Sequence, residues 1–171
     1  MKHAAYEVDL VNEQGLPIGT KTRQEIQKAT DLYHTIFVLL NTPEGRLLLT
    51  EIPERTDLPN MYPGLLGVTV ATIRRHLETP DQAASRAVAK EVYIEDLPLT
   101  KMGDHYTELP DGRRQYISLY SGVHAMPEEY SHTDISNLQA FTPDEITKNL
   151  ATEPQRFAPA FVDIWQRYMI S

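Results

Sequence analysis

Two glutamates near the middle of the chain are the side chains best suited to chemistry. Glu78 precedes a helix-like stretch, and Glu91 lies close to the end of that stretch. Carboxylate oxygens are the ligands that Mg²⁺ and Mn²⁺ prefer in proteins. Glu78 and Glu91 are therefore the candidate catalytic residues and the candidate ligands of a weak metal site.

The helix face that carries Glu91 is only partly acidic. Positions 87, 90 and 91 are neighbours on one side of a helix, because they are spaced by three and four residues. These positions hold Ala87, Lys90 and Glu91. Two unit charges about 4 Å apart interact by ~4 kcal/mol at an effective dielectric near 20, so a divalent cation beside Lys90 is strongly disfavoured. We therefore expect no cofactor of high affinity.

The cations of the same region could instead bind phosphate. The candidates are Arg74, Arg75, Arg86 and Lys90, whose side chains form charge-assisted hydrogen bonds with phosphate oxygens. A second cationic pair, Arg113–Arg114, could act with Arg74–Arg75 if the fold brings the pairs together. The alternative that Lys90 points into solvent stays open.

A helix over Thr79–Val92 must position these groups. Thr79 can cap the helix, Pro80 suits its first turn, and Gln82 completes a capping box. Alanines 83, 84 and 87 allow close packing against a sheet. The expected loop leading into the helix is Ala71–Leu77.

The remaining elements are a mixture of strands and helices without a regular alternation, which indicates an α+β fold. Proline, glycine and aspartate at the turns indicate two hairpins, one between His34–Asn41 and Arg46–Ile52 and one around Pro110-Asp111-Gly112. The other expected elements are strands Tyr6–Asn12, Leu65–Ala71, Tyr106–Leu109, Gln115–Val123 and Asn137–Phe141, a loop from Pro53 to Gly64, a short helix from Thr142, and a final helix Phe157–Met169.

The composition favours a single cytoplasmic domain over residues 1–171. The chain has no cysteine and a formal charge of −8, which disfavours disulfides, thiolate metal sites and broad nucleic-acid binding. No leader-like segment is apparent at Met1–Glu7, and no apolar run approaches the roughly 18 residues of a membrane helix, so no membrane partner is expected. A homodimer stays open.

The segment from Tyr62 to Ile94 resembles the signature region of Nudix (MutT-like) hydrolases. The family pattern is Gly, five residues, Glu, seven residues, then Arg-Glu-aliphatic-any-Glu-Glu-any-Gly-aliphatic. Without a gap, it falls here on Thr72, Glu78, Arg86, Ala87, Val88, Lys90, Glu91, Tyr93 and Ile94. Asp9-Leu10-Val11-Asn12, Gly45-Arg46-Leu47-Leu48-Leu49 and Phe157-Ala158-Pro159 are similar to the isopentenyl-diphosphate-isomerase-like branch.

The resemblance implies the Nudix fold, a mixed β-sheet between α-helices, and metal-dependent hydrolysis of diphosphates. It also implies a structural role for Arg86, which would tie the loop to the helix. The signature is degenerate, because Ala87 and Lys90 replace two carboxylates and Ala71, Thr72 and Tyr93 stand where the family has a cysteine or glycines. Ala87→Glu combined with Lys90→Glu is therefore expected to restore metal binding.

The isomerase reaction itself is not expected. Residue by residue, the catalytic cysteine of the isomerases falls at Ala71, a metal-binding histidine at Ile73, and the paired glutamates near Arg113 and Gln115. His34 matches a metal histidine of that branch, but without its partners it is better interpreted as a hydrogen-bonded structural residue.

Two functional hypotheses follow. In the first, the chain binds a small phosphorylated metabolite that contains a diphosphate, cations replace the metal, and hydrolysis is weak or lost. In the second, it is an active hydrolase of nucleoside-diphosphate-type substrates, in which Glu78 and Glu91 hold Mg²⁺ or Mn²⁺ with a carboxylate from elsewhere. Candidates for that carboxylate are Glu95, Asp104 and Glu108.

Overall fold

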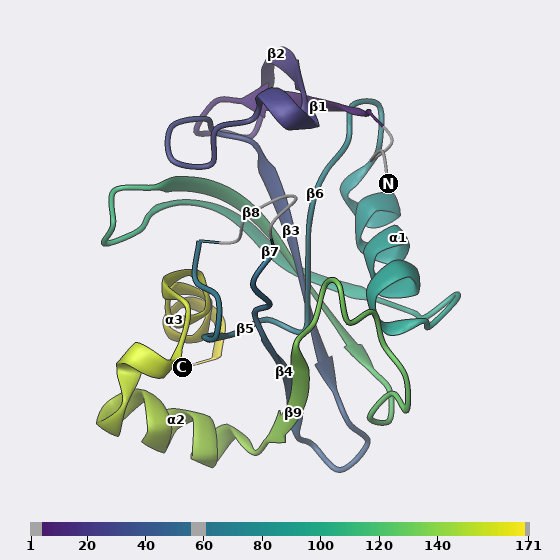
Figure 1. Ribbon diagram of the computed structural model, residues 1–171, viewed down its shortest axis with the longest axis vertical. Coiled ribbons are helices and arrows are strands. Elements are labelled where there is room, and N and C mark those ends of the chain that lie inside the picture. Colours follow the sequence, from purple (N-terminus) through teal and green to yellow (C-terminus); the bar gives the residue numbers. More distant parts are fainter. Residues whose placement is uncertain (1–4, 56–60, 170–171) are drawn as a thin grey trace.

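A mixed β-sheet lies between α1 (Pro80–Val92) on one face and α2 (Pro143–Thr152) with α3 (Pro159–Ile164) on the other (Figure 1). The computed structural model describes residues 5–55 and 61–169. The strands are β1 (Glu7–Val11), β2 (Pro17–Thr22), β3 (His34–Asn41), β4 (Leu47–Glu51), β5 (Leu66–Gly67), β6 (Val70–Ile73), β7 (Thr100–Glu108), β8 (Arg114–Val123) and β9 (Asn137–Phe141). The expected α+β sandwich is confirmed.

The central strand β3 determines where the two cores form. It pairs in parallel with β8 and antiparallel with β4 and β6. Successive side chains of a strand point to opposite faces. Accordingly, Ile36 and Val38 pack toward α1, whereas Phe37 and Leu39 pack toward α3. Burial on both faces explains why this strand is a continuous apolar run rather than an alternating one.

Helix α1 begins as its sequence indicates. Thr79 is the N-cap and accepts a hydrogen bond from the Gln82 backbone N–H at 3.1 Å, while the Gln82 side chain accepts from the Thr79 N–H at 3.0 Å. The alanines at 83, 84 and 87 are buried against the sheet. Because α1 is capped at its start and packed along this face, its backbone sets which side chains lie on the opposite edge.

The expected strand Leu65–Ala71 is divided in the structure. Its first part, β5, pairs with β4, and its second part, β6, pairs with β3. Between them the buried Thr69 hydroxyl accepts a hydrogen bond from the Leu40 N–H at 2.9 Å and donates one to the Leu48 carbonyl. The segment therefore enters between β3 and β4 where they separate, and this long-range arrangement has no local sequence signal.

Other boundaries differ from the expected ones. The strand expected at Tyr106–Leu109 begins at Thr100, and the expected final helix is divided into α3 and a π-helical turn, η3 (Trp165–Met169). Strand β2 and the short 3₁₀ turn η1 (Arg23–Glu25) were not expected, because Pro17 and Gly19 disfavour a strand. Pro17 and Gly19 are tolerated because β2 is an edge strand, paired with β1 in a separate two-stranded sheet.

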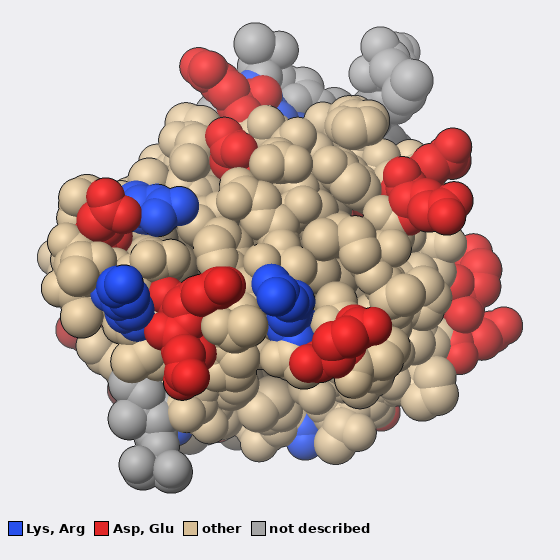
Figure 2. All heavy atoms as spheres, turned by 90° about the horizontal axis from the view of Figure 1, so that it is seen from below, with Lys and Arg blue, Asp and Glu red and all other residues tan. Residues whose placement is uncertain are grey.

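Two expectations lie partly outside the described residues. Residues 56–60 of the expected loop Pro53–Gly64 are not described, and neither are residues 1–4, to which the expected absence of a leader refers. No described helix is long and apolar enough to cross a membrane. The face seen in Figure 2 carries scattered charged side chains, mostly acidic, and no cluster of basic ones.

Tyr93, which occupies the family's glycine position at the end of α1, has a left-handed backbone with φ 59° and ψ 34°. This conformation costs an L-residue roughly 1–2 kcal/mol, and glycine adopts it freely. We expect Tyr93→Gly to raise the free energy of unfolding by about 1 kcal/mol in urea denaturation. Tyr93→Ala is the control, because it removes the ring and keeps the Cβ; equal stability of the two variants would contradict the strain.

Candidate functional site

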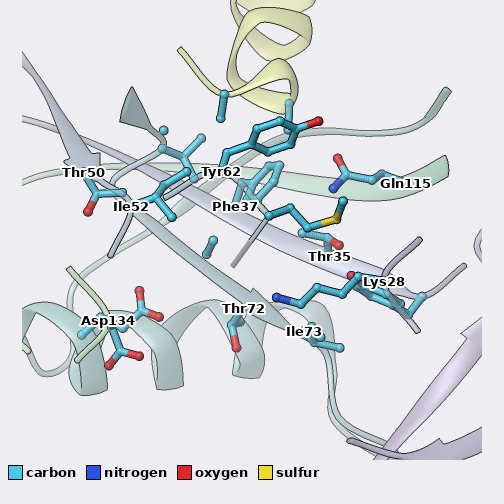
Figure 3. Close-up of a pocket in the computed structure, with 18 of the residues that line it drawn as sticks. Lys28, Thr35, Phe37, Thr50, Ile52, Tyr62, Thr72, Ile73, Gln115 and Asp134 are labelled. Atoms are coloured by element: carbon cyan, nitrogen blue, oxygen red, sulfur yellow. The ribbon is translucent and has the colours of Figure 1, made fainter. Parts of the chain in front are cut away.

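A cavity of about 470 Å³ opens where β3 and β4 separate. Its lining combines residues of the sheet, of the 62–75 segment, of the pocket-side edge of α1 and of α3. Figure 3 shows Phe37, Thr50 and Ile52 around the cavity, with Thr72 above α1 and Asp134 at one side. The signature region and the sheet therefore enclose one common space.

The charge of this lining is opposite to that of the whole chain. The formal charge of the chain is −8, and the carboxylates that line the cavity among the described residues are those of Glu91 and Asp134. The cationic side chains that line it are Arg23, Lys28, Arg55, Arg75, Arg86, Lys90 and Arg113. An enclosed space with an excess of cations attracts anionic ligands.

Arg86 ties the loop to the helix, as the resemblance implies. Its Nε donates to Glu78 Oε1 at 2.6 Å, and its Nη2 donates to Glu78 Oε2 at 3.1 Å and to the Ile73 carbonyl at 3.1 Å. Burial favours a raised pKa for Glu78, but the hydrogen bonds from Arg86 and the Arg75 backbone outweigh it and lower the pKa. Glu78 is thus held by Arg86, in a contact that we call the Arg86–Glu78 clamp, and it does not line the cavity.

The paired arginines of the loop point in different directions. Arg74 donates to Asp9 Oδ2 at 3.1 Å and to the Glu78 carbonyl at 2.8 Å, and it does not line the cavity. Arg75 does line it, with its guanidinium 4.2 Å from the centroid of the Tyr6 ring. No described residue forms an ion pair with the Arg75 side chain. Of the phosphate-binding candidates, Arg75, Arg86 and Lys90 face the cavity and Arg74 does not.

Glu91 is buried, with 8% of its surface exposed. Burial and the nearby Asp134 raise its pKa well above the ordinary value, although Lys90 and the Ala71 N–H act in the opposite direction. Asp134 lies 3.6 Å from Lys90 Nζ and 3.4 Å from Arg55 Nη1. Lys90 therefore shares a carboxylate with Arg55 and, with 61% of its side chain exposed, also contacts solvent.

The three-position face expected on α1 is divided. Lys90 and Glu91 line the cavity, whereas Ala87 is 1% exposed, lies in the apolar core with Val38, and does not reach the cavity. A glutamate at 87 would place a carboxylate against that core. The geometry therefore argues against rebuilding a metal site with Ala87→Glu and Lys90→Glu together, because of these two positions only position 90 lines the cavity.

The side chains at the cavity do not fit a magnesium site of three carboxylates. Across residues 5–55 and 61–169, no three histidine, aspartate or glutamate side chains are grouped so that they could hold a metal ion. Asp104 is paired with Lys101 at 2.9 Å, and Glu108 accepts a hydrogen bond from Tyr106 at 2.9 Å. Neither these two carboxylates nor that of Glu95 lines the cavity, so the expected third carboxylate is not among them.

His34 has the structural surroundings expected of it. Its Nε2 lies 2.6 Å from the Ser118 hydroxyl, which donates to Asp104. Burial and the charge of Arg74 lower the pKa of His34 to about 4. It does not line the cavity.

Sequence reasoning missed several of the residues that line the cavity. The two cationic pairs do meet there, but only through Arg75 and Arg113, while Arg114 points to the Thr30 carbonyl. Arg23, Lys28, Arg55 and Asp134 carry no motif, so only the tertiary fold reveals them.

Comparison with known proteins agrees with the resemblance, although no protein-family model matches the chain. An uncharacterised Nudix hydrolase of Pseudomonas aeruginosa, PA4841, is 26% identical over 156 residues, which are 91% of this chain and 87% of that protein. The uncharacterised Nudix hydrolase YfcD of Salmonella typhi is 25% identical over 140 residues, 82% of this chain and 74% of that protein.

Solved structures support the same relationship at the level of the fold. DR0079 of Deinococcus radiodurans superposes with a TM-score of 0.80 and 20% identity, covering 96% of this chain and 99% of that one. A Nudix hydrolase from Nitrosomonas europaea superposes with a TM-score of 0.58 and 21% identity, covering 80% and 87%. The chain therefore has the fold of Nudix proteins.

Proposed function

We propose that this Nudix-fold protein binds a small metabolite containing a diphosphate. We propose further that cationic side chains neutralise the diphosphate charge, in place of the metal ion that the Nudix signature holds. The single observation that carries the proposal is the excess of cationic side chains in the cavity beside α1. Hydrolysis by such a site is weak or absent, because the signature carboxylates are mostly missing.

Arg75 and Lys90 are the groups assigned to the diphosphate. The Arg75 guanidinium is held over Tyr6 and has no carboxylate partner among the described residues. Lys90 is 3.6 Å from Asp134 and mostly exposed, so it can turn toward a ligand at little cost. Hydrogen bonds from guanidinium and ammonium groups to phosphate are among the stronger ones in proteins. Arg86 contributes mainly by holding the loop that presents Arg75.

The second candidate function is metal-dependent hydrolysis of a nucleoside-diphosphate-type substrate. It is favoured by the relatives, which are Nudix hydrolases by name, and by the proximity of Glu91 to Asp134. This function would require another ligand for the metal, since Glu78 is held by Arg86. The two functions therefore differ in their dependence on Mg²⁺ or Mn²⁺.

A thermal-shift panel tests the proposal. Nucleoside diphosphates, dinucleotides, sugar nucleotides and isoprenoid diphosphates are each added at millimolar concentration, in EDTA and in magnesium. A ligand that binds only the folded state stabilises it by about 2.7 kcal/mol at 100 times Kd. We expect one diphosphate class to raise the Tm equally in both buffers and to be recovered intact. Stabilisation only with magnesium, accompanied by release of phosphate or a monophosphate, would favour the hydrolase instead.

A further inference from the structure

We propose that the cavity contains a second anion-binding subsite, formed by Arg23, Lys28 and Arg113 at the end opposite Asp134 and Lys90. The ligand then carries an anionic group at each end, a diphosphate near α1 and a separate phosphate or carboxylate near Arg23. The diphosphate half of this assignment rests on the proposed function, whereas the second subsite rests on the residues described below.

Arg23 is a buried cation that has no counter-ion among the described residues. It lies in η1, where its backbone N–H donates to the Tyr6 carbonyl at 2.9 Å, and it is 8% exposed. Its side chain lines the cavity and forms no hydrogen bond or ion pair with any residue in 5–55 and 61–169. Burial of a charged group is costly unless that group is paired, so an anion in the cavity would supply the counter-ion that the described residues do not provide.

Lys28 and Arg113 bring further positive charge to the same end. Figure 3 shows the Lys28 side chain extending into the cavity, on the side opposite Asp134. Burial and the neighbouring cations Arg23, Arg55 and Arg113 lower the pKa of Lys28 to about 8. Arg113 is 9% exposed, with its Nε 2.9 Å from Asp111 and its guanidinium 5.0 Å from the Tyr62 ring centroid.

Two polar side chains at this end have no hydrogen-bond partner in the part of the chain that the structure describes. They are Thr35 Oγ1 and Gln115 Oε1, which are buried in residues that line the cavity. Thr35 is 7% exposed and Gln115 is 9% exposed. Figure 3 shows both on the same side of the cavity as Lys28. Buried polar atoms are nearly always satisfied in folded proteins, so these two point to a ligand that offers hydrogen-bonding groups.

These contacts define the class of ligand. Guanidinium groups match the geometry of both phosphate and carboxylate oxygens. The Thr35 hydroxyl can donate to such an oxygen, and the Gln115 amide can accept from a ligand hydroxyl. Phe37 and the Tyr62 ring provide apolar surface between the two ends. A metabolite with a diphosphate, a hydroxylated or ring-containing middle and a distal anion satisfies all of these groups.

Calorimetric titration with inorganic pyrophosphate in EDTA tests the two subsites separately. We expect two sites per chain in the wild type. Arg23→Gln and Lys28→Gln should each weaken one site by at least about tenfold, the effect of losing one charge-assisted hydrogen bond, and should leave the other unchanged. Lys90→Gln should have the reverse pattern. The matched control is Arg46→Gln, which removes an exposed arginine outside the cavity. Circular dichroism verifies that every variant is folded.

Two ligand pairs then identify the distal anion. NADP and NAD differ by one phosphate, and UDP-glucuronate and UDP-glucose differ by one carboxylate. If NADP binds more tightly than NAD, or UDP-glucuronate more tightly than UDP-glucose, and if Arg23→Gln removes that difference in affinity, the subsite is supported. The pair that shows the difference identifies the anion as a phosphate or a carboxylate. A single pyrophosphate site that is unaffected by Arg23→Gln and Lys28→Gln would overturn the inference. If one pyrophosphate site is weakened by Arg23→Gln and no site is weakened by Lys90→Gln, the inference is supported and the proposed function is contradicted.

Discussion

Replacing Arg86 with methionine is expected to lower the free energy of unfolding by about 3 kcal/mol, the lower end of the cost of breaking a buried ion pair from one side, because the Arg86–Glu78 pair is partly buried. Arg86 donates to both carboxylate oxygens of Glu78 and to the Ile73 carbonyl. Methionine preserves much of the aliphatic volume but no donor. The Glu78 side chain, 13% exposed, then keeps its charge without its main partner.

Urea denaturation of the variant measures this cost. Arg46→Met is the matched control, because Arg46 is exposed and outside the clamp; it should change stability by less than about 0.5 kcal/mol. Adding Glu78→Gln to Arg86→Met should recover part of the loss, since the unpaired charge is then removed. If Arg86→Met behaved like Arg46→Met, the clamp would have no role in holding the loop.

Local signals made α1 and its clamp predictable from sequence. The capping box at Thr79 and Gln82 involves neighbours in the chain, and the helical spacing of the alanines indicates the buried face. Arg86 and Glu78 are eight residues apart, in one segment that resembles the Nudix signature. The contact between Arg86 and Glu78 can therefore be inferred from this segment alone, without knowing where the rest of the chain lies.

The cavity was not predictable in the same way. It depends on Thr69 bridging Leu40 and Leu48, contacts that span 29 and 21 residues. It also depends on Arg23, Lys28 and Asp134, which reach it from segments without any motif. Side chains of ordinary type in irregular segments carry no periodicity, so their convergence appears only once the sheet is assembled.

The same distinction explains why the expected and the observed places of position 87 differ. Helical spacing correctly places 87, 90 and 91 on adjacent parts of the surface of α1, but it does not locate the boundary between core and cavity. In the structure this boundary passes between Ala87 and its neighbours one turn later, Lys90 and Glu91. Of positions 87 and 90, only position 90 therefore brings its side chain and its charge to the cavity.

Lys90→Glu alone is accordingly expected to convert the site from one that attracts anions to one that attracts cations. The substitution changes the local charge by two units beside Glu91 and Asp134, which already line the cavity. A close contact between two charges contributes on the order of 1 kcal/mol at the dielectric constant of water and about 4 kcal/mol at that near a protein surface. Mn²⁺ binding should strengthen at least tenfold, equivalent to about 1.4 kcal/mol, and pyrophosphate binding in EDTA should weaken by a similar factor.

Calorimetric titrations of manganese and of pyrophosphate into the wild type and the variant measure both changes. Lys148→Glu is the matched control, since it makes the same charge change on an exposed position of α2 outside the cavity. It should alter neither affinity beyond about twofold, because its charge is exposed to water and does not line the cavity, so solvent and salt screen it. If Lys90→Glu and Lys148→Glu gave equal affinities, position 90 would not face a binding site, and the assignment of Lys90 to the diphosphate would have to be abandoned.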